Sequence, residues 1–228
     1  MAPSRRGTTS TASVGYKRLL AHCRCMNADE FRDELRDARD TELSRLSSSK
    51  AVYALTGGEM TGAAVRTGTA RELSALELIF ERWADAADGE SAELFADAAE
   101  FAATSAGSFD SDAGDGARHV VADALDAEHE VARLGAAAAA FLVLDDLAGQ
   151  LVGFFVGDAD RKSADEFRTF RTELAEYGDD ATGLLAAHCE SEADEEAARD
   201  AGAAVVDGAY DWYVETLESM GVEPKNVC

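Results

Sequence analysis

The scarcity of proline and isoleucine constrains this chain most, because it leaves helix as the regular structure that the sequence favours. Among 228 residues there are 2 prolines, and the single isoleucine is Ile79. About one residue in five is alanine, and alanine, leucine, arginine and glutamate have the highest helix propensities. Valine is scattered and forms no alternating runs that would indicate strands. The sequence therefore predicts an all-α fold.

The chain is strongly acidic, and its charge is unevenly distributed. The formal net charge is −24, but residues 1–25 hold five arginines and lysines and no acidic residue, so the other 203 residues carry a formal charge of −29. Disorder is one interpretation, but it requires low hydrophobicity, and 46% of the residues are hydrophobic. The other is a folded protein adapted to molar salt, which shortens the Debye length to about 3 Å. With lysine nearly absent, the composition resembles that of haloarchaeal cytoplasmic proteins.

Charge and hydropathy also limit the expected partners. Direct nucleic-acid binding is not expected, because phosphate contacts need clustered lysine and arginine. No membrane span is expected at residues 143–156, because Asp145, Asp146 and Gln150 interrupt this segment and a span needs about 20 apolar residues. We expect a protein partner or a homodimer, and a cytoplasmic location.

The basic N-terminal segment is expected to lie outside the folded domain. Residues 1–25 lack the long apolar core of a signal peptide, and we interpret them as a disordered extension that an upstream misreading of the start codon would explain. Met26 precedes Asn27-x-x-Glu30, a capping-box pattern that begins a helix. The sequence thus predicts one helical domain over residues 26–228.

Helix signals predict four helices on each side of a loop rich in glycine, serine and aspartate at residues 107–116. The helix over 163–189 contains Gly178, where a break is allowed. Five consecutive alanines at 136–140 predict a helix face that packs closely against a neighbour. The predicted helices cover residues 28–39, 41–56, 62–87, 91–106, 117–142, 145–157, 163–189 and 194–220.

Two glutamates are predicted to point inward from long helices. At 100° per residue, Glu72 falls in the apolar stripe of Leu76 and Trp83. Glu128 falls in the stripe of Leu125 on the predicted 117–142 helix. A buried carboxylate is costly unless it is paired, hydrogen-bonded or bound to metal. Each glutamate therefore meets an arginine or a backbone group, serves as a metal ligand, or lies elsewhere because the assumed helical register is wrong.

The predicted helix over 91–106 consists almost wholly of small residues. With Leu94 inward, Ala102 and Ser105 form an inward pair at i, i+3, while Glu100 falls on the solvent side. This helix therefore has no carboxylate or imidazole on its inward face.

The run "ARELSALELIFERWADAADGESAELFADAAEFAATSAGSF" (residues 70–109) resembles the first helix pair of ferritin-like, rubrerythrin-type proteins. It shares with them an early glutamate, an aromatic-rich helix, a short glycine-bearing turn and an x-LF-x-x-x-A helix. The motifs "ELSRLSSSKAVYALTGGEM", "QLVGFFVGDAD" and "YVETLESMGVEPKNVC" are similar to haloarchaeal proteins labelled rubrerythrin-family, some of which carry a transcription anti-termination label. The resemblance implies a ferritin-like helical bundle with additional N- and C-terminal helices.

The resemblance also implies a set of metal ligands. Ferritin-like di-iron proteins use one glutamate from each of two helices and Glu-x-x-His from each of the other two. Glu72 matches the first-helix glutamate, Glu128 matches the third-helix glutamate, and His188 lies on the inward face of the last bundle helix. The second-helix Glu-x-x-His falls on Ala102 and Ser105, and the sequence contains no Glu-x-x-His. Glu72, Glu128 and His188 are therefore candidate metal ligands, too few for a di-iron centre.

Three functions stay open at this point. The leading hypothesis is a non-catalytic, rubrerythrin-family helical bundle with a degenerate metal site, no cofactor and an interaction or regulatory role. The alternative is a di-iron or other metal-dependent oxidoreductase that handles peroxide, with iron bound by Glu72, Glu128 and His188. The second alternative is a regulator of the transcription anti-termination type that acts through protein partners.

Overall fold

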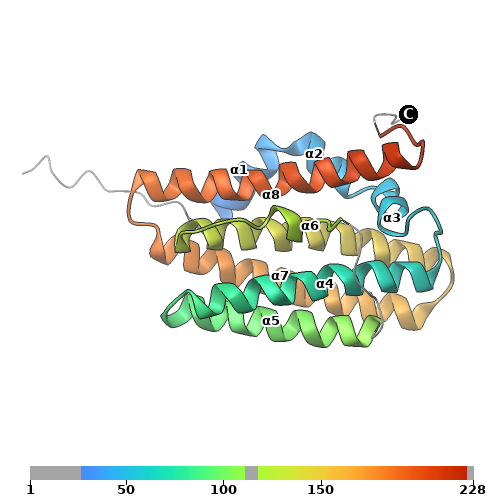
Figure 1. Cartoon of the computed structure of the whole chain (residues 1–228), viewed down its shortest axis with the longest axis horizontal. Coiled ribbons are helices and arrows are strands. Elements are labelled where there is room, and N and C mark those ends of the chain that lie inside the picture. The colour runs from blue at the N-terminus through green and yellow to red at the C-terminus, as the bar shows by residue number, and fades with distance from the viewer. Residues whose placement is uncertain (1–26, 111–117, 225–228) are drawn as a thin grey trace, which may run out of the picture.

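The computed structural model describes residues 27–110 and 118–224, and this part of the chain contains helices and no strand (Figure 1). The all-α prediction is confirmed. The predicted extension at 1–25 and most of the predicted 107–116 loop lie outside the described residues. The helices are α1 (Ala28–Ala38), α2 (Asp40–Leu46), α3 (Ser49–Leu55), α4 (Gly62–Asp85), α5 (Gly89–Phe109), the 3-10 helix η1 (Ala122–Ala124), α6 (Glu130–Gly157), α7 (Arg161–His188) and α8 (Glu192–Ser219).

The first described helix begins at its predicted capping box. The Asn27 side chain accepts a hydrogen bond from the Glu30 backbone N–H at 2.8 Å and donates one to the Glu30 carboxylate at 3.3 Å. These bonds satisfy helix-terminal groups that would otherwise lack a partner. The sequence signal at Asn27 therefore marks the start of α1.

One predicted helix divides in two. The segment 41–56 forms α2 and α3, which are separated at Ser47 and Ser48. The Ser48 hydroxyl donates to the carbonyl of Arg45 at 2.6 Å, and the Ser47 hydroxyl donates to the carbonyl of Ser44 at 3.3 Å. Serine hydroxyls that bond to the preceding turn compete with helical hydrogen bonds, which explains the interruption.

The prediction for residues 117–157 is wrong in a different way. Residues 118–129 are irregular apart from η1, and the long helix α6 begins only at Glu130. It then continues through residues 143–144, where a break between two helices was expected. Helix α7 is also continuous through Gly178.

Helix α6 is the central element of the bundle (Figure 1). It forms an antiparallel hairpin with α7 and packs along α8, while α4 and α5 form a second antiparallel hairpin. Every residue from Leu134 to Leu144 is buried. Among the described residues, α6 is also the one helix with the length and apolar composition to cross a membrane, a test that buried core helices pass as well.

Small residues allow α6 and α8 to approach closely. A Cβ atom on Gly135 of α6 would lie 2.5 Å from the carbonyl oxygen of Ala198 of α8. A Cβ atom on Gly202 of α8 would lie 2.9 Å from the Phe31 ring and 3.3 Å from the carbonyl oxygen of Gly135. The alanines at 136–140 are all buried, so the predicted close-packed face is confirmed.

Aromatic rings fill the space between the two hairpins, whose backbones lie further apart than those of α6 and α7. Ring centroids of Phe80 on α4 and Phe141 on α6 are 5.5 Å apart. Those of Phe109 on α5 and Phe167 on α7 are 4.5 Å apart. Such pairs combine large apolar burial with favourable ring geometry. The hairpins are thus held together by bulky side chains.

The close contact of α6 with α8 leads to a stability prediction. We expect Gly135→Ala to lower the free energy of unfolding by about 1–3 kcal/mol, because the added methyl group overlaps the α8 backbone. The matched control is Gly183→Ala on α7, where nothing lies within 4 Å of the added Cβ. That change should raise stability by about 0.5–1 kcal/mol through helix propensity. Denaturant unfolding at constant salt measures both, and an equal response would contradict the prediction.

Candidate functional site

The predicted inward glutamate of α4 is buried, and backbone groups occupy its carboxylate. The Glu72 side chain is 4% exposed. Its oxygens accept hydrogen bonds from the backbone N–H groups of Val120 at 2.5 Å, Val121 at 2.9 Å and Ala122 at 3.0 Å. Three N–H donors satisfy the carboxylate and fix the chain that enters η1. Among the roles that the sequence left open, the structure shows Glu72 bonded to backbone groups.

The other two candidate ligands are not brought to Glu72. Glu128 is exposed in the irregular segment before α6, so the prediction that it points inward is wrong, because no helix forms over 118–129. His188 is half-buried near the C-terminal end of α7, with its Nδ1 3.5 Å from Oε1 of Glu130. Across residues 27–110 and 118–224, no three His, Cys, Asp or Glu side chains gather in a way that could hold a metal ion.

The inward face of α5 consists mainly of small apolar residues, as predicted. Leu94, Ala98 and Ala102 are buried, and Glu100 is exposed. Ser105, however, is half-exposed and lines a groove between α5 and α7. The residue that would match a metal-binding histidine therefore lies in a surface groove and not in the core.

This groove has a volume of about 600 Å³, and its walls are α5 and α7. Aromatic side chains form an apolar stack along the groove. The ring centroid of Phe101 lies 5.8 Å from that of Phe170 and 4.9 Å from that of Tyr177. Hydroxyl groups and carboxylates make up the rest of the lining. The lining residues are Asp97, Glu100, Phe101, Thr104, Ser105, Ser108, Phe109, Glu166, Thr169, Phe170, Glu173 and Tyr177.

Negative charge converges on one end of the groove. The Tyr177 hydroxyl donates a hydrogen bond to the backbone carbonyl of Asp97 at 3.1 Å. Burial raises the pKa of Tyr177, and the carboxylates of Asp97, Glu173, Glu100 and Asp180 raise it further. Among the described residues, the side chains of Asp97, Glu100 and Glu173 form no ion pair. Their charge is available to a cation.

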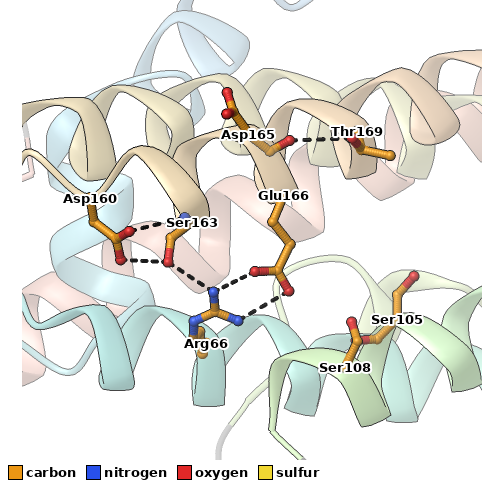
Figure 2. Close-up of polar contacts among 8 residues, drawn as sticks. All are labelled: Arg66, Ser105, Ser108, Asp160, Ser163, Asp165, Glu166 and Thr169. Atoms are coloured by element: carbon orange, nitrogen blue, oxygen red, sulfur yellow. Dashed lines mark hydrogen bonds and ion pairs between the residues drawn. The ribbon is translucent and has the colours of Figure 1, made fainter.

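At the other end of the groove, Arg66 of α4 binds the lining residue Glu166 (Figure 2). The Arg66 guanidinium donates to both Glu166 oxygens, at 3.2 and 2.6 Å, and to the Ser163 hydroxyl at 2.9 Å. It also lies about 6 Å from the ring centroids of Phe109 and Phe167. The hydrogen bond to Glu166 raises the pKa of Arg66. The charge of Glu166 is therefore balanced by Arg66, whereas Asp97, Glu100 and Glu173 have no such partner among the described residues.

Sequence reasoning missed His119, which lies beside Glu72. Its Nδ1 is 3.5 Å from Glu72 Oε2, close enough for an ion pair, yet makes no hydrogen bond. The proximity of the Glu72 carboxylate raises the pKa of His119, against the opposing effect of burial. Because the two residues are far apart in the chain and lie on different elements, no spacing motif could have indicated this pair.

The fold and the groove together define an all-α helical bundle with an acidic, aromatic-lined surface groove. Comparison with known protein families, curated proteins and solved structures finds no match to this chain.

The hydrogen bonds of Glu72 lead to a second prediction. In Glu72→Gln, the side-chain oxygen can still accept from Val121 and Ala122, but the amide NH₂ faces the N–H group of Val120. We expect a loss of about 2–4 kcal/mol in the free energy of unfolding, because a charge-assisted bond is replaced by two opposed donors. The control is Glu81→Gln, exposed on the same helix, which should change stability by less than about 0.5 kcal/mol. Equal losses in urea unfolding would refute a structural role for Glu72.

The ion pair of His119 makes stability depend on pH. Because the folded state raises the pKa of His119, the stabilisation is complete below the unfolded pKa of about 6.5 and is lost as pH rises through the folded pKa. We expect the stability difference between wild type and His119→Gln to shrink over this window. Thermal unfolding at constant salt measures it. A difference that stays constant or grows with pH would contradict the assignment.

Proposed function

We propose that this chain is a non-catalytic helical-bundle interaction module that binds a basic helical segment of a partner protein in the groove between α5 and α7. The observation that carries the proposal is the combination of unpaired carboxylates and stacked aromatic rings in one groove. Carboxylates attract lysine and arginine, and the faces of aromatic rings bind their cationic groups and apolar stems.

The length of the groove between two helical walls suits a helix as the bound segment. On α5, Asp97, Phe101, Thr104 and Ser108 repeat at three to four residues. On α7, the lining residues Glu166, Phe170, Glu173 and Tyr177 have the same spacing. The lining residues span 97–109 on α5 and 166–177 on α7, so each wall is about 17–18 Å long at 1.5 Å per residue. A partner helix of about three turns fits this length, as in other helix-in-groove complexes.

The remaining parts of the functional hypothesis agree with this mode of binding. A salt-adapted cytoplasmic protein of the rubrerythrin type would hold its partner through aromatic contacts that molar salt does not screen. Regulation of the anti-termination type would act through the same protein–protein contact. No observation on the described residues favours the oxidoreductase alternative, since the Glu72 carboxylate is already bonded to three backbone N–H groups.

A synthetic amphipathic helix with lysine and arginine on one face and leucine and phenylalanine on the other tests the proposal. We expect saturable 1:1 binding by calorimetry, and about tenfold weaker binding to Glu100→Gln/Glu173→Gln, because the pair supplies charge at the aromatic stack. The matched control, Glu93→Gln/Glu176→Gln, makes the same charge change at exposed positions of the same two helices. It should leave the affinity within about twofold.

Equal weakening by the two double variants would show that net charge alone attracts the peptide, and would contradict a specific groove. A peptide with glutamate in place of lysine and arginine should not bind. Iron, manganese and zinc are measured in the same preparations. Near-stoichiometric metal that is lost on Glu72→Ala would support the oxidoreductase alternative instead.

A further inference from the structure

A second pocket lies between the end of α3, the middle of α4, residues 118–120 and the C-terminal part of α8. Its volume is about 150 Å³, a quarter of that of the α5–α7 groove. This pocket is separate from the groove. Helix α8, which lines the pocket, and α5, which lines the groove, lie on opposite sides of the bundle in Figure 1. The lining residues are Ala54, Leu55, Gly57, Gly68, Arg71, Glu72, Arg118, His119, Val120, Trp212 and Thr216.

Basic side chains gather in this pocket although the chain as a whole is acidic. Arg71, Arg118 and His119 all line it. The described residues that carry negative charge nearby are already engaged: Glu72 accepts three backbone N–H groups, and Glu215 forms an ion pair with Arg118. The carboxylate of Asp123 accepts the backbone N–H of His119 at 2.9 Å.

Arg71 is the unsatisfied member of the cluster. Its Nε is buried and makes no hydrogen bond, and within the described residues its guanidinium forms no ion pair. A guanidinium group is always charged, and a buried donor without an acceptor is costly. Arg71 and His119 line the same pocket, and the charge of Arg71 opposes the rise in the pKa of His119. Arg71 therefore needs an acceptor that this part of the chain does not supply.

The shape of the pocket limits what that acceptor can be. Trp212 and Thr216 of α8 line it beside the basic groups, so an apolar face and a hydroxyl are present. Gly57 has a φ of 58° and nothing within 4 Å of the position of a Cβ atom, so the α3 end leaves open space. About 150 Å³ accommodates a phosphate or a short carboxylate, and it is too small for a nucleotide.

We propose that the pocket formed by Arg71, Arg118, His119 and Trp212 binds a small oxyanion, a phosphate or a carboxylate group. Arg71 is the main anchor, because its planar guanidinium offers parallel N–H donors that match the oxygens of such a group. Arg118, which is paired with Glu215, and His119, which lies beside Glu72, are on the segment that Glu72 holds in place, and both line the pocket next to Arg71. A small anionic ligand would thus bind to the element that connects the two helical hairpins.

The test uses inorganic phosphate, and then succinate, titrated into the full chain at fixed potassium chloride. Binding is followed by the NMR signals of the His119 ring and by calorimetry. We expect saturable 1:1 binding of at least one of the two anions, and Arg71→Gln should weaken it about tenfold or more, because a charged hydrogen-bond donor is removed. The matched control is Arg82→Gln, exposed on the same helix, which should leave the affinity within about twofold.

Circular dichroism verifies that each variant is folded. If Arg71→Gln does not fold, Arg118→Gln takes its place, since Arg118 is half-exposed and its removal leaves no buried donor. No saturable binding of either anion would overturn the proposal. Binding that is unchanged in the arginine variant would overturn it as well. Neither result bears on peptide binding in the α5–α7 groove, which is tested with a peptide ligand and with glutamate variants of α5 and α7.

Discussion

The hydrogen bonds between one buried carboxylate and three successive backbone N–H groups determine how the two helical hairpins are connected. Glu72, in the middle of α4, accepts the N–H groups of Val120, Val121 and Ala122 and so holds the segment that leads into α6. A carboxylate in the core is tolerated because these donors, and the neighbouring His119, replace the water that it loses. The same bonds fix the course of the chain at residues 120–122, and Arg118 and His119 just before them line the small pocket beside Glu72.

Two kinds of packing then produce the two surfaces on which function is proposed. Glycine and alanine on α6 allow α8 to approach until backbone meets backbone, as at Gly135 and Ala198. Phenylalanines keep the α4–α5 hairpin further from α6 and α7, and stacked rings fill the difference. Where this wider spacing reaches the surface, between α5 and α7, it leaves a groove with aromatic walls.

The net charge of the chain conceals a difference between the groove and the pocket near Glu72. The chain carries a formal charge of −24, and the groove shares its acidic character, since the carboxylates at one end raise the pKa of Tyr177. The pocket near Glu72 differs, because two arginines and a histidine line it together with the Glu72 carboxylate. An acidic surface favours solubility in salt, whereas the buried Nε of Arg71, which has no hydrogen-bond partner, is the observation behind the proposed anion site.

The sequence by itself determined the features that depend on neighbours within a few residues. These are the all-α class, the capping box at Asn27, the close-packed alanines at 136–140, and the burial of Glu72 within its apolar stripe. Only the tertiary structure decided what Glu72 bonds to, because its partners lie 48 to 50 residues further along the chain. Helical periodicity misplaced Glu128 because periodicity assumes a helix, whereas residues 125–129 are irregular and α6 begins only at Glu130. The groove and the basic pocket likewise arise from residues on separate elements, and no local pattern in the chain encodes them.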